Sequence, residues 1–181
     1  MFLQATFESM GPRLQEVYNH LFVAEDLPEV MKPVLLKFIL KDGKDRSEVS
    51  SYRPIALISS TARLFSKILV NRIQRVFARI ISPDQQGFIS GRSSHNNIQR
   101  LQQVVDCIKS EPEAHAQSTI LQLDFQKAFD RVNHDFLEKR LKEIKMPGNI
   151  INGIMLLVTK QYGQFSINQF MGSSFDIQQG L

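Results

Sequence analysis

The sequence predicts an α+β fold in which a mostly antiparallel sheet packs against helices. The composition, 43% hydrophobic and 22% charged, is that of an ordinary globular protein. Several stretches repeat apolar residues at helical spacing. Others are short runs that are rich in β-forming residues or that alternate apolar and polar residues, and they end at glycine or proline turns. Helices and strands are therefore expected in one chain, without the regular alternation of a parallel α/β protein.

The first sixty residues are predicted to hold one helix and two strands. The helix is expected over residues 13–25, with Pro12 at its start. The apolar run over residues 34–40 is expected to be a strand that ends in a charged turn. Residues 50–58 are expected to be extended, because Pro54 disfavours helical backbone at the residue before it.

The middle of the chain is predicted to hold two helices joined by a polar loop with two glycines. The first helix is expected over residues 62–81, capped by Ser60 or Thr61. The loop covers residues 85–94, and the second helix residues 96–108.

The last third begins with an alternating run over residues 118–125, which predicts a strand with Asp124 near its end. A helix is expected to follow, to about Lys145. Its predicted buried side chains are Phe129, Val132, Phe136, Leu137, Leu141 and Ile144. The remaining predicted elements are a helix over 149–160, a strand over 162–170, a turn over 171–174 and a return strand over 175–178.

Composition excludes several classes of protein. The single cysteine, Cys107, rules out an intrachain disulfide and Cys-rich zinc sites, and is expected to be a small core residue. No apolar run reaches the about 20 residues of a membrane span, and residues 1–8 do not resemble a secretory signal. An intracellular location is therefore expected, in the nucleus or the cytoplasm. The four histidines are scattered and are expected to be solvated; they are His20, His95, His115 and His134.

Positive charge is concentrated between Arg53 and Arg100. This stretch holds eight basic residues and one acid, Asp84, a net charge of +7 in a chain whose total is +4. Such a field suits a polyanion such as a nucleic acid. A solvated helix face with loop arginines explains it equally well.

Asp124 is the residue that most resembles part of a reactive site. A carboxylate at a strand end, beside a turn into a helix, is a suitable ligand for Mg²⁺, which takes few protein carboxylates and fills its shell with water and phosphate oxygens. The backbone N–H groups of Phe125 and Gln126 would face a triphosphate. Taken alone, the pattern also fits an ordinary strand-end aspartate followed by a helix cap at Asp130.

Six blocks in series change this interpretation. They read FILKDGKD (38–45), YRPIAL (52–57), FSKILVNRI (65–73), SPDQQGFISGRS (82–93), LDFQKAFDRVNH (123–134) and IQQG (177–180). Together they resemble the reverse transcriptase of non-LTR (LINE-type) retrotransposons, with motif A at 123–134 and the opening of motif B at 177–180. The resemblance covers roughly residues 27–181.

The resemblance implies an incomplete right-hand polymerase. Residues 1–26 would be a helical lead-in, 27–117 the fingers and 118–181 the first part of the palm. Asp124, with Phe125 beside it, would belong to the site of two Mg²⁺ ions, for which Mn²⁺ is a possible substitute. The ions would activate a primer 3′-hydroxyl and stabilise the pyrophosphate leaving group.

The resemblance also implies nucleotide contacts from both halves. Lys41 and Arg53 would reach the triphosphate, with Lys44 as the alternative to Lys41. Phe129 would be a steric gate against a ribose 2′-hydroxyl. The alternative is that its side chain only packs in the hydrophobic core. The other implied nucleotide contacts are Phe125, Gln126, Gln179 and Gly180.

The implied partners are an RNA template, a DNA primer, deoxynucleoside triphosphates and the rest of the palm and thumb; no membrane is involved. Gly91, Arg92 and Ser93 would follow the template. A further group of arginines would touch phosphates or solvent: Arg72, Arg75 and Arg79.

The chain departs from the family pattern in four places. It contains no Asp-Asp pair, so the Tyr/Phe-x-Asp-Asp box is missing. Three further positions are unusual for the family. Met31 stands where the family often has Trp, Gln178 where it usually has Arg, and Leu181 where Cys is common. The sequence is therefore expected to be a fragment without polymerase activity of its own. Two alternatives stay open: a catalytically dead RNA-binding remnant, and a group II intron-type or other cellular reverse transcriptase.

Overall fold

A computed structural model describes residues 6–115, 117–168 and 170–180. Two compact units divide the chain, residues 1–69 with 127–181 and residues 70–126, and each is described by itself. The elements of the first unit are α2 (Phe7–Leu21), η1 (Glu29–Met31), β1 (Pro33–Leu40), η2 (Val49–Ser51), β2 (Tyr52–Ile58), the start of α3 (Ser60–Ile80), η3 (Phe129–Arg131), α5 (His134–Glu143), α6 (Gly148–Thr159), β3 (Tyr162–Ile167) and β4 (Phe170–Asp176). The second unit contains the rest of α3 and α4 (His95–Ser110).

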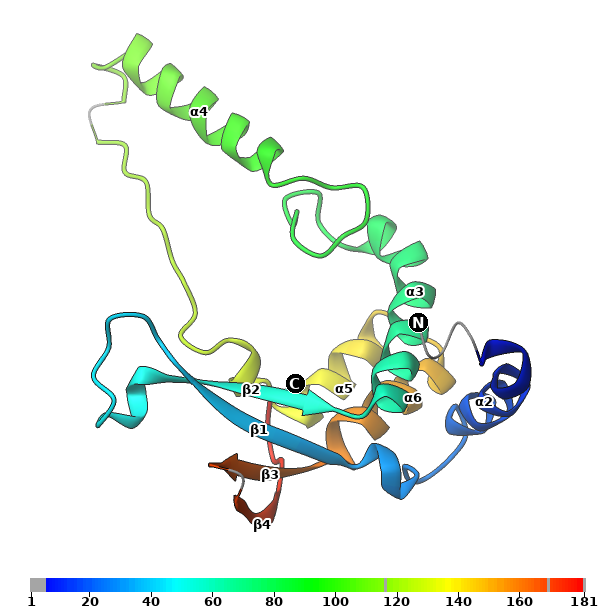
Figure 1. The fold of residues 1–181 in the computed structure, drawn as a ribbon. Coiled ribbons are helices and arrows are strands. Elements are labelled where there is room, and N and C mark those ends of the chain that lie inside the picture. The colour runs from blue at the N-terminus through cyan, green and yellow to red at the C-terminus, as the bar shows by residue number, and fades with distance from the viewer. Residues whose placement is uncertain (1–5, 116, 169, 181) are drawn as a thin grey trace. The chain divides into compact units, whose positions relative to one another are not determined.

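Four strands form one sheet in the order β2-β1-β3-β4 (Figure 1). The β1–β2 and β3–β4 pairs are antiparallel, as expected, whereas β1 and β3 are parallel, with Pro33 opposite Tyr162. The mixed α/β content confirms the coarse fold class, and the sheet joins strands from both halves of the sequence.

The turn predicted over residues 171–174 is wrong, because those residues lie inside β4. Ile167 pairs directly with Phe170, so the connection is shorter and falls earlier. Asn168 has a φ of 49°, the left-handed region that asparagine tolerates better than most residues. Gly172 therefore serves as a strand residue. Gln169, inside the strand predicted over 162–170, lies outside the described residues, as do residues 1–5 and Leu181.

One face of the sheet carries a row of aromatic rings. Phe38 stacks on Phe165 with ring centroids 5.7 Å apart, and Phe165 stacks on Phe175 at 4.7 Å. Gly163 lies opposite Phe175, and a Cβ at this glycine would come within 2.3 Å of the ring. The glycine thus leaves the space that the Phe175 ring occupies.

The core of the first unit surrounds Phe65 on α3, whose side chain is fully buried. Tyr18 on α2 stacks on its ring, Phe22 meets it edge-on, and Gly153 on α6 allows close approach of the helices. Asn152 on α6 donates to the carbonyl of Ala24, 2.9 Å away, which ties α6 to the end of α2. Three helices from distant parts of the sequence therefore share one core.

Two predicted helix starts are wrong. Helix α2 begins at Phe7 and not at Arg13, so Pro12 lies inside the helix, where it lacks one backbone donor. For α3, the capping side chain is neither Ser60 nor Thr61. The Ser59 hydroxyl accepts from the amide of Ala62 at 3.2 Å and caps the helix.

Residues 118–125 are extended, but the predicted strand is wrong, because they form no sheet ladder with the part of the chain that the structure describes. Their alternating apolar residues are exposed: Leu121 by 76% and Leu123 by 80%. Alternation shows which residues share a side, but a strand also needs a hydrogen-bonding partner.

The helix predicted to follow is shorter than expected. Asn133, and not Asp130, caps α5, accepting from the amide of Phe136 at 2.8 Å. The predicted apolar stripe is only partly buried, since Phe129 is 62% and Phe136 60% exposed, while Leu141 is buried.

Cys107 on α4 is exposed, which contradicts its predicted place in a core. Its sulfur lies 3.8 Å from Nε2 of His115. Among the described residues, no helix combines the length and apolar character that crossing a lipid bilayer requires.

Candidate functional site

Asp124 is exposed and lies in the extended segment at the end of the second unit. Phe125 beside it is 85% exposed, and Gln126 is exposed as well. Within the described ranges, His, Cys, Asp and Glu residues form no group of three or more that would hold a metal ion. The Asp124 carboxylate is therefore accessible to solvent.

Two of the predicted triphosphate ligands share one face of the β1–β2 hairpin. Arg53 pairs with Ile39, and Lys41 follows two residues later on the same side. The Lys41 backbone amide donates to Ser51, and its Nζ donates to the Ser50 carbonyl at 2.7 Å. Arg53 is exposed. The alternative, Lys44, lies exposed in the turn. The hairpin thus carries both cationic residues, Lys41 with its Nζ on the Ser50 carbonyl and Arg53 exposed.

The opening of motif B docks on the second half of the motif A block. The Gly180 amide donates to the carbonyl of Val132 at 2.9 Å, and Gln179 forms a β-bridge with Asn133. Gly180 has a φ of +94°, and a Cβ there would come within 3.2 Å of the Asp130 backbone. A side chain at this position would therefore be strained. Backbone contacts thus bring Gln179 and Gly180 to the segment that begins at Phe129, whose side chain is exposed.

His134 is buried, which contradicts its predicted place on a solvated helix face. Its Nε2 lies 2.9 Å from the carbonyl oxygen of Gly180. A carbonyl only accepts, so Nε2 carries the proton and donates. The ring thus holds the motif B segment against the first turn of α5.

We expect His134→Phe, which keeps the ring but loses the donor, to lower the free energy of unfolding by about 1–2 kcal/mol. The exchange rate of the Gly180 amide hydrogen should rise by the factor that corresponds to a similar free energy. Urea unfolding and native-state hydrogen exchange measure the two effects. His95→Phe, at an exposed position, is the matched control; equal effects of both variants would contradict the role of His134.

Arg92 in the predicted template loop is engaged by the protein itself. Its guanidinium donates to the carbonyls at the end of α3 and in the loop, at 2.6 to 3.0 Å: Ala78, Ile81, Ser82 and Gln85. Gly91 has a φ of +80° and Ser93 is exposed. Arg92 therefore fixes the loop, and its predicted contact with the template stays a prediction.

The predicted site residues fall into two sets. The first unit holds two groups of them. Lys41 and Arg53, the hairpin pair, lie on the β1–β2 hairpin. The other group is Phe129, Gln179 and Gly180. The second unit holds the remainder: Gly91, Arg92, Ser93, Asp124, Phe125 and Gln126.

Two features escaped the sequence analysis. His134 contacts a residue 46 positions away, which no local periodicity reveals. The polar residues Asn96, Gln99 and Gln103 on α4 have the helical spacing i, i+3, i+7, and this signal was available in the sequence.

Comparison with known proteins agrees with the motifs. The model of the reverse transcriptase (RNA-dependent DNA polymerase) family matches residues 39–180. The chain is 33% identical over 129 residues to a probable RNA-directed DNA polymerase from transposon X-element of Drosophila melanogaster, covering 70% of this chain and 14% of that protein. It is 32% identical over 131 residues to the probable RNA-directed DNA polymerase from transposon BS of the same species, covering 71% and 14%.

A third relative is the RNA-directed DNA polymerase from mobile element jockey of Drosophila funebris, 30% identical over 133 residues, covering 72% of this chain and 14% of that protein. The chain thus spans about a seventh of the length of these curated relatives. The matched family model covers most of the sequence and all six motif blocks except the first residue of the first. The chain belongs to the reverse transcriptase family, of the non-LTR retrotransposon type.

Proposed function

We propose that this chain supplies the fingers and the first part of the palm of an RNA-directed DNA polymerase. In this proposal, Asp124 is a metal-binding carboxylate and the hairpin pair Lys41 and Arg53 binds the triphosphate. The templates and substrates are RNA, a DNA primer and deoxynucleoside triphosphates, in an intracellular compartment. The observation that carries the proposal is an exposed motif A carboxylate in a chain whose family model matches residues 39–180.

The residues present fit one part of a magnesium site. Mg²⁺ binds through one or two protein carboxylates and keeps waters and substrate phosphates as its other ligands. Asp124 offers one such carboxylate to solvent, and the adjoining residues Phe125 and Gln126 are exposed as well. When bound, the metal would supply Lewis-acid stabilisation of phosphate charge.

The chain's own residues contribute binding and orientation. Arg53 presents a planar guanidinium that matches two phosphate oxygens, and Lys41 adds a second positive charge on the same hairpin face. Phe129 is exposed, and in this proposal its ring meets the sugar of a nucleotide. A ring at that point excludes a ribose 2′-hydroxyl by contact, which favours deoxyribonucleotides.

The test measures Mn²⁺ binding, in the presence of a deoxynucleoside triphosphate, by electron paramagnetic resonance. We expect Asp124→Asn to weaken nucleotide-dependent Mn²⁺ binding about tenfold, a loss of about 1.4 kcal/mol. Asp176→Asn, at an exposed position on β4, is the matched control and should bind as the parent chain does. Equal binding by the Asp124 variant and the parent would refute the metal-binding role.

The second candidate is an RNA-binding remnant without catalysis, favoured by the +7 charge between Arg53 and Arg100. Nucleic-acid binding that depends on salt is expected in both cases. The Mn²⁺ measurement separates them, because a remnant would bind RNA without a metal site that depends on Asp124.

A further inference from the structure

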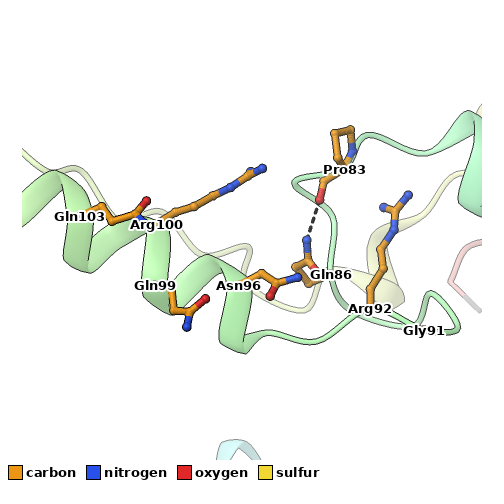
Figure 2. Close-up of a pocket in the computed structure, with 8 residues that line it drawn as sticks. All are labelled: Pro83, Gln86, Gly91, Arg92, Asn96, Gln99, Arg100 and Gln103. Carbon is orange, nitrogen blue, oxygen red and sulfur yellow. Dashed lines mark hydrogen bonds between the residues drawn. The ribbon is translucent and has the colours of Figure 1, made fainter.

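Helix α4 borders a cavity at each end, and both cavities lie inside the second unit. At its start, next to the loop after α3, Arg92 and Arg100 line the cavity (Figure 2), and both are engaged by carbonyls or by Asp84. The cavity at the other end has a volume of about 420 Å³. It is lined by Cys107 and His115 together with three aliphatic and two hydroxyl side chains. This second cavity therefore contains a nucleophile and a base.

The path of the chain after α4 brings the thiol and the imidazole together. The Cys107 carbonyl accepts from the Glu111 amide at 3.2 Å and from the Ser110 hydroxyl at 2.9 Å, which closes the last turn of the helix. The His115 amide then donates to the Glu111 carbonyl at 3.2 Å, in a turn that returns the chain toward the helix. Sγ of Cys107 thereby lies 3.8 Å from Nε2 of His115. In the tautomer that carries its proton on Nδ1, Nε2 accepts from the thiol.

Both side chains are accessible to a reagent. Cys107 is exposed and His115 is half-buried. The thiolate is the nucleophilic form of cysteine, and an adjacent imidazole that takes the proton is a common way to produce it. Cys107 is also the only cysteine of the sequence, so no second thiol of the chain competes for a reagent. The pair thus has the groups that covalent reaction with an electrophile requires.

Aliphatic side chains form the wall beside the sulfur. Val104 and Ile108 come from α4, and Ile120 comes from the extended segment that follows. Val104 is 51% and Ile120 54% exposed, so an alkyl chain in the cavity would cover apolar surface that now contacts water. Ser118 and Thr119 line the same cavity, and their hydroxyls are donors for a carbonyl oxygen. The lining therefore suits a reagent with an alkyl tail and a carbonyl group.

The charge around the cavity favours a neutral reagent. Three acids and one base lie between residues 104 and 115: Asp106, Glu111, Glu113 and Lys109. Their excess of negative charge repels an anionic reagent, such as a peptide disulfide with several carboxylates. A neutral electrophile approaches the sulfur without this repulsion.

We propose that the cavity is a covalent modification site, in which Cys107 adds to a neutral α,β-unsaturated aldehyde with an alkyl tail. The thiol proton passes to Nε2 of His115, and the sulfur forms a bond to the β-carbon of the aldehyde. The electron pair of the C=C bond moves toward the carbonyl to give an enolate, and the imidazolium returns the proton to the α-carbon. No group leaves and no oxidant is consumed, so the product is a saturated aldehyde joined to the protein by a thioether. The inference goes beyond the proposed function and does not rest on it.

The test measures the rate at which the full chain loses its thiol in butenal or nonenal, two such aldehydes that differ in the length of the alkyl tail. Samples are denatured before thiol titration, and N-acetylcysteine supplies the intrinsic rate of each aldehyde. Relative to those rates, we expect Cys107 to favour nonenal over butenal about tenfold, because the longer tail leaves water. His115→Phe should slow both reactions about tenfold, because the proton acceptor is lost. Intact-protein mass spectrometry should show no thioether adduct with Cys107→Ser.

A second variant probes the apolar wall. Val104→Thr keeps the shape of the side chain and replaces a methyl group with a hydroxyl, so most of the preference for nonenal should be lost. Val76→Thr on α3 is the matched control, because Val76 and Val104 are both 51% exposed. Equal effects of the two threonine variants would show that the wall does not bind the tail.

Two further outcomes overturn the proposal. One is a parent chain that reacts with both aldehydes no faster than N-acetylcysteine does. The other is an unchanged rate in both His115→Phe and His115→Gln, since glutamine is polar but does not accept the proton. Circular dichroism of these variants verifies that α4 keeps its helix content, so that a slower reaction reports the lost base and not lost folding. The Mn²⁺ measurement on Asp124 is independent, so an unreactive Cys107 leaves the metal-binding role standing.

Discussion

Arg92→Met is expected to release the loop over residues 82–93 while the rest of the chain stays folded. The parent guanidinium donates to carbonyls of Ala78 and Ile81 near the end of α3 and to two carbonyls in the loop. Helix ends leave carbonyls without intrahelical partners, and a positive charge there is favourable. Methionine fills a similar volume but satisfies none of these acceptors.

The expected cost is about 3 kcal/mol of local stability, because hydrogen bonds to charged groups contribute more than neutral ones, although water replaces part of the loss. Native-state hydrogen exchange of the peptide over residues 82–93 should then be about a hundredfold faster. Arg75→Met, at an exposed position on α3, is the matched control. Unchanged protection in the Arg92 variant would show that the loop is held by other contacts.

Arg92→Lys is expected to recover only part of the protection. An ammonium donates from one point, whereas the planar guanidinium reaches four carbonyls from two nitrogens. The arginine of the GRS block thus has a structural reason to be an arginine, whether or not it contacts RNA. Loss of RNA binding in an Arg92 variant would consequently be ambiguous, because the variant also loses the contacts that hold the loop.

Local sequence patterns were sufficient to predict many of the helices and strands. The run over 34–40 and the extended segment around Pro54 became the β1–β2 hairpin, and the helical spacing over 62–81 became α3 with a shift of one or two residues. These predictions succeed because apolar periodicity and proline geometry act within a few residues.

Contacts between distant residues were not predictable in the same way. The alternation over 118–125 predicted a strand, but a ladder depends on a partner elsewhere in the chain. The burial of His134 depends on Gly180, and the four acceptors of Arg92 depend on how the loop folds back on α3. The motif resemblance therefore identified candidate site residues, while their hydrogen-bond partners emerged only from the structure.

Phe65→Ala should be the most destabilising single truncation in the helical core. The Phe65 side chain is fully buried, and its ring lies 5.6 Å from that of Tyr18 and 5.5 Å from that of Phe22. Truncation removes buried apolar surface and leaves a cavity between α2, α3 and α6. Phenylalanine-to-alanine changes at such positions cost about 3–5 kcal/mol.

A loss of this size is a large part of the about 5–15 kcal/mol that stabilises a typical native protein. Urea unfolding followed by circular dichroism should show a lower midpoint for Phe65→Ala and a smaller shift for Phe65→Leu. Phe170→Ala, whose ring is 80% exposed on β4, removes the same atoms from a solvated site and should cost much less. If both alanine variants lose equal stability, Phe65 is not the centre of the core. A double-mutant cycle with Tyr18→Ala would then show whether the stacked pair contributes the about 0.5–1.5 kcal/mol expected beyond burial.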